Sequence, residues 1–412
     1  LSRYYIRVLY HFYIGYIYTY SPEVVPLSSS QTQELVWMVA KDLDYATSAA
    51  VPLTERFPFL ETIKTQHAPS LQPPSILNTA MIRERQCCVN IFMMILDFAP
   101  SCVRVGPKGY YIMKEYKKHA ADIYSMELKQ GDVFVASYQR SGTTWTQELV
   151  WMVANDLDYE KSAAVPLVQR YPFLDYSVRK ENPTYFYIVE VVGDNEKGRQ
   201  VVEFMTIPAT KILSGMPSPR FVKTHLPMSL LPPKILDTAK VVYVARDPRD
   251  VAVSCYHHAK LFKMMGFKGS FKEMWNAFIN DLYILTPYFE HVKEAWALRH
   301  HPNMLFLFYE DLSKDLPSSI RRVSDFFGKK LSPDQMERLC DHLSIQNFKN
   351  NASINWEDMR EFGFMDSKET FIRKGKTGGW RDYFDEEMVQ DADRWIANNL
   401  RDTDLRFPSM DH

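Results

Sequence analysis

Short apolar runs alternate, from about residue 131 onward, with longer segments that carry an apolar residue at every third or fourth position. The runs at 133–138, 240–245 and 304–308 are rich in Val, Phe, Tyr and Leu, which favours buried parallel strands. Residues 145–157 and 249–260 follow the first two runs with a helical period. The alternation predicts an α/β fold, a single P-loop-like domain with a central parallel sheet flanked by helices and with ligands at the carboxyl ends of the strands.

One internal repeat divides the chain. Residues 32–60 recur almost unchanged at 146–174, and residues 64–80 resemble 223–239. The two matches have different offsets, because the early copy lacks a counterpart of the stretch that ends before Lys223. A solenoid would show several equal periods, so a repeat architecture is excluded.

The early copy has also lost the polar residues that could carry chemistry. Gln66 stands where the later copy has His225, and LSSSQ stands where the later copy has SGTTW. We therefore expect residues 1–100 to form a degenerate partial repeat, an irregular N-terminal extension that is accessory or poorly packed. Residues 101–412 are expected to form the functional domain.

The charge balance adds a constraint on partners. The 412 residues contain 49 Lys and Arg against 50 Asp and Glu, a formal net charge of −1. Such a chain does not bind nucleic acid or an anionic membrane with its whole surface, so an anionic ligand needs a local cluster of Arg and Lys. Five cysteines without a CxxC pair argue against a disulfide framework and a zinc site, and the opening stretch 4–20 is too polar for a membrane span. We expect a cytoplasmic protein without a metal.

The first apolar run ends in a loop that suits an anion. The sequence QRSGTT at 139–144 links this strand to the helix that is expected to begin near Trp145. Free backbone N–H groups and the helix dipole converge at such a turn, and Arg140 and the hydroxyl groups add charge and donors. An ordinary strand-to-helix turn explains the same pattern, so the loop alone leaves both interpretations open.

A second strand-to-helix junction follows the run 240–245. Arg246 comes at the end of the strand, and Ser254 comes about two turns into the next helix, so the pair can hold a phosphate from two sides. The alternative is a surface Arg that pairs with Asp247 or Asp250.

Two further segments carry candidate chemistry. Lys223 and His225 follow a brief β-type run, and alternate residues of a strand face the same way, so one can take a proton while the other stabilises negative charge. A lone His is more often structural, and the nearby Lys changes that balance. The sequence RKGKTGGW at 373–380 is typical of either a loop that wraps an anion or a solvated basic loop.

SGTTW after a strand, KTHLP, RDPRDVAVS and RKGKTGGW occur in the order and at the spacing of cytosolic animal sulfotransferases, and residues 102–408 resemble that family. The resemblance implies 3′-phosphoadenosine-5′-phosphosulfate (PAPS) as cofactor and PAP as product. It implies in-line transfer of a sulfuryl group, without a metal, to a hydroxyl or amine of a small hydrophobic acceptor. Its catalytic residues are His225 as general base, with Lys223 and Arg140. Its cofactor-binding residues are Arg140, Ser141, Gly142, Thr143, Thr144, Trp145, Arg246, Ser254, Tyr309, Ser344, Ile345, Arg373, Lys374 and Gly375.

Several positions depart from the usual pattern of the family. Gln139 and Arg140 replace a Pro and a Lys, and the planar guanidinium differs from a point ammonium in how it holds a leaving phosphate. Ile345 replaces a Phe that stacks on adenine, and Gly379 replaces an Asp. The short dimerisation signature of the family is not visible in 381–389, which leaves a homodimer open.

The sequence does not name the acceptor. Residues 262–296 are rich in aromatic residues and fit a lid over an apolar phenol, steroid, retinoid or catecholamine, although any one of these aromatics is more often a core residue. Two alternatives stay open: a non-catalytic relative that binds the nucleotide, and a P-loop-type nucleotide kinase. The kinase is disfavoured because the loop lacks the Gly-Lys-Ser/Thr ending that places a lysine at the phosphates.

Overall fold

The computed structural model describes residues 82–83, 102–175, 177–178, 180, 183–373 and 375–410, all within the compact unit Pro74–His412. Lys374 lies outside the described residues. So does the expected N-terminal extension, apart from its residues 82–83.

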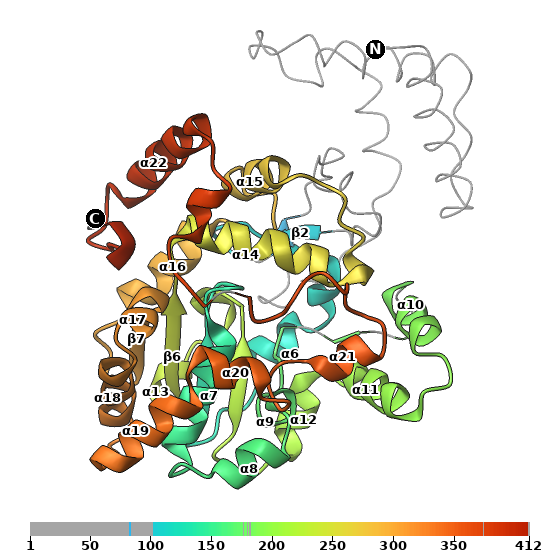
Figure 1. The fold of residues 1–412 in the computed structure, drawn as a ribbon, viewed down its shortest axis with the longest axis vertical. Coiled ribbons are helices and arrows are strands. Elements are labelled where there is room, and N and C mark those ends of the chain that lie inside the picture. The colour runs from blue at the N-terminus through green and yellow to red at the C-terminus, as the bar shows by residue number, and fades with distance from the viewer. Residues whose placement is uncertain are drawn as a thin grey trace, which may run out of the picture. The chain divides into compact units, whose positions relative to one another are not determined.

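Four parallel strands form the centre of the described fold (Figure 1). In spatial order they are β5 (Phe221–Thr224), β4 (Val133–Ala136), β6 (Lys240–Ala245) and β7 (Met304–Phe308). In the register, Val133 pairs with both Phe221 and Lys240. The predicted parallel sheet is therefore confirmed, and the first strand is two residues shorter than its apolar run. A separate antiparallel sheet has the order β1 (Ile82–Arg83), β2 (Cys102–Val105) and β3 (Tyr110–Met113).

Helices connect and cover the strands. Those in the first half of the described residues are α6 (Ala120–Tyr124), α7 (Thr143–Ala154), α8 (Tyr159–Ala164), α9 (Leu167–Arg170), α10 (Pro183–Val192), α11 (Glu196–Thr206), α12 (Ala209–Gly215) and α13 (Ile235–Thr238). Those in the second half are α14 (Pro248–Leu261), α15 (Phe271–Ile279), α16 (Tyr288–Ala297), α17 (Tyr309–Lys314), α18 (Leu316–Phe326), α19 (Pro333–His342), α20 (Ile345–Asn350), α21 (Glu357–Glu361) and α22 (Glu386–Leu400). Single 3₁₀ turns are η1 (Lys114–Lys118), η2 (Met228–Leu230), η3 (Lys263–Met265), η4 (Gly379–Asp382) and η5 (Pro408–Met410).

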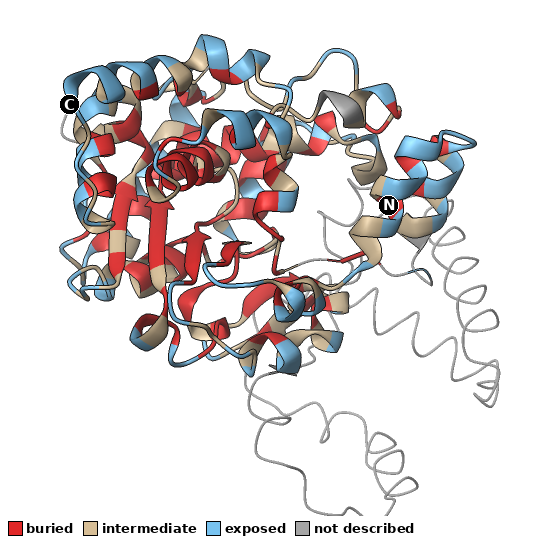
Figure 2. Ribbon diagram, turned by 90° about the horizontal axis from the view of Figure 1, so that it is seen from below, coloured by how far each residue is buried: buried red, intermediate tan, exposed pale blue. Residues whose placement is uncertain are grey.

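The sheet is buried on both faces because alternate side chains of a strand enter two different cores. Phe134 and Tyr243 belong to one core, together with residues of α14, α15, α16 and α22. Val135 and Val242 belong to the other, together with residues of α7, α18 and α19. Figure 2 shows the strands as buried and the outward surfaces of the helices as exposed. The strands therefore read as nearly continuous apolar runs.

The strand order determines where a ligand can bind. From β4 the chain passes to β5 on one side and then returns to β6 on the other side of β4. A crevice opens at the carboxyl ends of the strands where successive connections diverge in this way. The loop after β4, His225 after β5 and Arg246 after β6 all stand at that end of the sheet.

The aromatic segment 262–296 lies mainly in the core. Trp275 and Phe278 of α15 and Tyr288 and Phe289 of α16 are buried and contact one another or α22. Packing against the sheet removes the large apolar surfaces of these aromatic side chains from water, which stabilises the fold. These four residues are core, as the alternative interpretation had it, while a lid formed by other residues of 262–296 stays a prediction.

Candidate active site

The loop after β4 is shaped by two residues with left-handed backbone. Arg140 has a φ of 64° and Gly142 a φ of 98°. At Gly142 a Cβ would lie 2.5 Å from Cδ2 of Tyr309, so glycine is required by both the backbone angle and the close approach. Gly142 is the N-cap of α7, which begins at Thr143, two residues before the predicted start. The hydroxyl of Ser141 in this loop is buried without a hydrogen-bond partner.

The side chain of Arg140 joins three segments that are far apart in the sequence. Its Nε donates to Oγ of Ser254 at 3.2 Å, and its Nη2 donates to the carbonyl of Phe371 at 3.0 Å. Burial and the nearby charges of Arg246 and Arg373 lower the pKa of the Arg140 guanidinium to about 10. Of the three arginines predicted to share one ligand, Arg246 and Arg373 therefore both lie within electrostatic range of Arg140.

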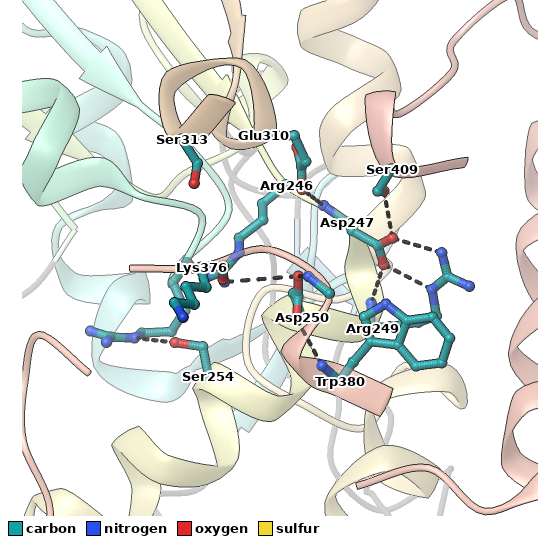
Figure 3. Close-up of polar contacts among 12 residues, drawn as sticks. Arg246, Asp247, Arg249, Asp250, Ser254, Glu310, Ser313, Lys376, Trp380 and Ser409 are labelled. Carbon is teal, nitrogen blue, oxygen red and sulfur yellow. Dashed lines mark hydrogen bonds and ion pairs between the residues drawn. The ribbon is translucent and has the colours of Figure 1, made fainter. Parts of the chain in front are cut away.

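Arg246 is buried but only weakly neutralised (Figure 3). Its Nη2 lies 3.2 Å from the carbonyl of Lys376 and 3.9 Å from a carboxylate oxygen of Asp250. Its guanidinium stacks over the ring of Tyr309 at 4.1 Å, and its Nε is buried without a partner. A buried arginine with an unused donor is suited to an anionic ligand.

The neighbouring acids are already engaged by other groups. Asp250 accepts from the backbone N–H groups of Gly378 at 2.7 Å and Trp380 at 3.0 Å. Asp247 forms a bidentate pair with Arg249, with a shorter bond of 2.7 Å. The alternative was a surface arginine paired with Asp247 or Asp250. It is wrong about the surface and about Asp247, because Arg246 is buried and Asp247 pairs with Arg249, but Arg246 does form a long ion pair of 3.9 Å with Asp250.

Three other predicted residues gather beside Arg246. The indole of Trp145 donates to the carbonyl of Leu343 at 2.9 Å, and its ring meets that of Tyr309 at a centroid distance of 5.8 Å. A Cβ on Gly375 would lie 2.5 Å from Cδ1 of Ile345, so the C-terminal loop passes directly over this side chain. Trp145 and Tyr309, which are predicted at the adenine, belong to one hydrophobic core, and Ile345 packs against that core.

The remaining predicted residues, Thr143, Thr144, Ser344 and Arg373, differ in their contacts. The hydroxyl of Thr143 hydrogen-bonds with that of Ser137 at 2.6 Å, while Thr144 is partly exposed. The side chain of Ser344 caps α20 by accepting from a backbone N–H at 3.3 Å. Arg373 lies 3.3 Å from the hydroxyl of Tyr383.

His225 is buried at the end of β5 and is held in one tautomer. Its Nδ1 lies 2.9 Å from the carbonyl oxygen of Ser137, which can only accept, so Nδ1 carries the hydrogen and Nε2 keeps its lone pair. The backbone carbonyl of His225 accepts from Nε2 of His291 at 2.8 Å. Burial, followed by the charge of Lys223, holds the pKa of His225 well below its usual value. The imidazole is therefore neutral at pH 7.

Lys223 lies beside His225 in partly apolar surroundings. Its Nζ is 4.4 Å from the centre of the Phe173 ring. Burial lowers the pKa of Lys223 to about 8, against the opposing influence of Asp175. Arg140 acts electrostatically on both Lys223 and His225, so the structure brings together the three residues predicted to be catalytic.

The sequence reasoning missed the segment 172–175, which lies beside β5. Leu174 N–H donates to the carbonyl of Lys223 at 2.9 Å, and Phe173 packs edge-on to His225 at 5.3 Å. Asp175 accepts from the Thr224 hydroxyl and from the backbone N–H of His225, both at 2.5 Å. A signal existed in the repeat, because RFPFLE at 56–61 corresponds to RYPFLD at 170–175, with a carboxylate at the end of both copies.

The described residues show neither a metal site nor a helix that could span a membrane. No group of three or more His, Cys, Asp and Glu side chains in them is arranged to hold a metal ion. None of the helices described here combines the length and the apolar character that crossing a bilayer demands.

Comparison with known proteins identifies the family. The model of the sulfotransferase domain matches residues 130–404. The chain belongs to the sulfotransferase family. It is 32% identical to luciferin sulfotransferase of Photinus pyralis over 74% of this chain and 80% of that protein. It is 30% identical to human Sulfotransferase 1E1 over 73% of this chain and 94% of that protein.

Two solved structures are more similar to this sulfotransferase. Retinol dehydratase in complex with androsterone and the inactive cofactor PAP is 50% identical, with a TM-score of 0.75 over 80% of this chain and 98% of that one. Its complex with retinol and PAP gives 52% identity and a TM-score of 0.72 over 77% and 95% of the two chains. The predicted family, the α/β fold, the transferase activity and PAPS as cofactor are confirmed, and the nucleotide kinase alternative is set aside.

The described residues fit this cofactor. The buried Ser141 hydroxyl and the Nε of Arg246 are donors without partners, and both stand at the carboxyl end of the sheet. Arg140 and Arg373 add two more cations within electrostatic range. A nucleotide with several negative charges needs cations that are not neutralised by the protein itself, and these groups meet that need.

Proposed function

We propose that this sulfotransferase acts on the hydroxyl group of a small apolar alcohol of the retinoid or steroid kind, with His225 as the general base. The observation that carries the proposal is the tautomer of His225, which leaves Nε2 as a proton acceptor at the crevice. The alcohol class is supported by the identity of 50–52% to retinol dehydratase, whose complexes contain androsterone or retinol. Luciferin sulfotransferase, a relative named for a different acceptor, is only 32% identical to this chain.

Each predicted site residue has a role in this proposal. PAPS supplies an activated sulfuryl group on a good leaving group. Nε2 of His225 takes the proton of the acceptor hydroxyl, and Lys223 and Arg140 stabilise the negative charge that develops on the transferred and leaving oxygens. The low pKa of His225 keeps it unprotonated at neutral pH, ready to accept that proton.

The other residues bind the nucleotide. The 5′-phosphosulfate is assigned to the loop of Arg140, Ser141, Gly142, Thr143 and Thr144. The 3′-phosphate is assigned to Arg246, Ser254, Arg373, Lys374 and Gly375. The adenine is assigned to Trp145, Tyr309, Ser344 and Ile345. The cluster around Tyr309 supports the last two assignments, because it joins the adenine residues to the guanidinium of Arg246.

Three further proposals concern the whole protein. A cytoplasmic location remains a prediction, and a homodimer remains an open alternative, for which 381–389 shows no dimerisation signature. So does the division into an accessory segment 1–100 and a functional domain 101–412.

The direct test is His225→Ala, assayed with labelled PAPS against retinol, androsterone and a simple phenol. We expect kcat to fall on the order of 100- to 10,000-fold, because the proton acceptor is lost, while affinity for PAP stays unchanged. His300→Ala, at an exposed histidine, is the matched control and should retain full activity. Turnover by His225→Ala within tenfold of the parent would refute the assignment of the base. Preference for the phenol over both alcohols would refute the acceptor class.

A further inference from the structure

Asp175 is the acidic group that lies against the catalytic end of β5. Its two carboxylate oxygens are used separately: one accepts from the hydroxyl of Thr224 and the other from the backbone N–H of His225, each at 2.5 Å. The Thr224 hydroxyl in turn accepts from the backbone N–H of Leu226 at 3.0 Å. The carboxylate therefore holds the turn that leaves β5 at three successive residues.

The segment that carries Asp175 is itself fixed to β5. Lys223 N–H donates to the carbonyl of Pro172 at 3.1 Å, and the carbonyl of Lys223 accepts from Leu174 at 2.9 Å. Between these bonds, Phe173 places its ring against both Lys223 and His225. Asp175 is thus placed by a strand-like pairing, and its position relative to His225 is set by backbone geometry.

We propose that Asp175 is a positioning residue for sulfuryl transfer, which fixes the Thr224–His225 turn with both carboxylate oxygens and balances the charge of Lys223. The proposal rests on the function proposed above for His225 and Lys223. Asp175 acts through those two residues and does not itself touch the reacting atoms.

The charges around Asp175 come from three directions. Lys223 faces it from β5. The groups on η1 and the turn after it are Glu115, Tyr116 and His119, which border the same small cavity. Besides burial, the charge of Arg140, from the loop after β4, lowers the pKa of Lys223, and the charges of Arg140 and Lys223 in turn lower the pKa of His258 on α14.

Loss of the negative charge of Asp175 is expected to lower the pKa of Lys223. Burial raises the pKa of Asp175 to about 7, and the hydrogen bonds from Thr224 and His225 and the charge of Lys223 oppose that rise. Burial lowers the pKa of Lys223 to about 8, and Asp175 opposes that fall. Removing the negative charge of Asp175 therefore makes Lys223 lose its proton at a lower pH. The alkaline limb of the activity profile should then move to lower pH.

Two substitutions separate geometry from charge. In Asp175→Asn, the amide oxygen can still accept from His225 N–H and the amide NH₂ can donate to Thr224, so the turn is kept and the charge is lost. In Asp175→Ala both contacts are lost. Asp402→Asn is the matched control, at a carboxylate whose side chain is 80% exposed.

The experiment measures kcat, the pH profile of kcat/KM for PAPS, the affinity for PAP and the thermal midpoint of each full-length variant. For Asp175→Asn we expect the alkaline midpoint to fall by on the order of one pH unit, since an opposite charge at close range shifts a pKa by this much or more. For Asp175→Ala we expect a loss in kcat on the order of 100-fold, the typical cost of a base misplaced by about 1 Å. Affinity for PAP should be unchanged in both.

The outcomes are decisive in either direction. If Asp175→Asn keeps the parental kcat and alkaline midpoint while His225→Ala is inactive, the role of Asp175 is refuted and the proposed function stands. If His225→Ala is active, the proposed function itself fails. A lower thermal midpoint together with weaker PAP binding in Asp175→Asn would make Asp175 a stabilising residue only, and would also overturn the proposal.

Discussion

Arg246 offers a quantitative test of the nucleotide site. It is the buried arginine whose Nε has no partner and whose nearest carboxylate oxygen is 3.9 Å away (Figure 3). We expect Arg246→Ala to weaken binding of PAP much more than binding of adenosine 5′-monophosphate, because only PAP carries the 3′-phosphate assigned to this residue.

The magnitude follows from the contact that is lost. A hydrogen bond to a charged group contributes about 1.5–3 kcal/mol. This corresponds to a loss of about 10- to 150-fold in affinity for PAP, at 1.4 kcal/mol for each factor of ten. Arg246 also joins two loops through the carbonyls of Arg140 and Lys376. If the substitution distorts these loops, it weakens the binding of both nucleotides, and this effect cancels in the ratio of their two affinities.

The assay is titration calorimetry of both nucleotides with the parent and the variant. Arg381→Ala is the matched control, since Arg381 is exposed and stacks on Trp380 in the same C-terminal loop. The control should leave the ratio of the two affinities unchanged. An equal loss for PAP and adenosine 5′-monophosphate in Arg246→Ala would refute the assignment of the 3′-phosphate and make Arg246 a residue that only joins the loops.

Two further predictions concern stability. Gly142→Ala should lower the free energy of unfolding by about 1–3 kcal/mol and weaken PAP binding, because the new Cβ meets Tyr309 in a left-handed backbone; unchanged denaturant midpoint and affinity would contradict this. Asp132→Ala should lower the free energy of unfolding by about 3–5 kcal/mol in a denaturant titration, because it leaves the buried charge of Arg220 unpaired. Asp194→Ala, at an exposed pair, is the control that should change little, and an equal effect of the two substitutions would refute the reasoning.

Local signals were sufficient for much of the fold. The runs 240–245 and 304–308 match β6 and β7 residue for residue, because a short apolar run between turn residues has few alternatives in a buried parallel sheet. The helix predicted at 249–260 is α14, extended by one residue at each end, with Pro248 in its first turn. The helix predicted at 145–157 is α7, which begins two residues earlier than predicted. It begins at Thr143 because Gly142, in left-handed conformation, is its N-cap.

The site was predicted less completely than the fold. Taken residue by residue, the sequence indicated Arg140, Arg246 and His225 as separate candidates, each with a structural alternative, and only the resemblance to the sulfotransferase family joined them in one site. It did not indicate Asp175, whose partners Thr224 and His225 are about 50 positions away. No local period reports a contact over such a separation.

The sequence by itself therefore determined the elements and the types of residue at their ends, since these follow from backbone preferences and from the spacing of apolar positions over a few residues. The tertiary structure alone decided which of those ends meet. It placed the guanidinium of Arg140 on Ser254, left a donor of Arg246 unused and set Asp175 against the turn of His225. It also made the aromatics of α15 and α16 core residues, because burial depends on which distant surfaces pack together.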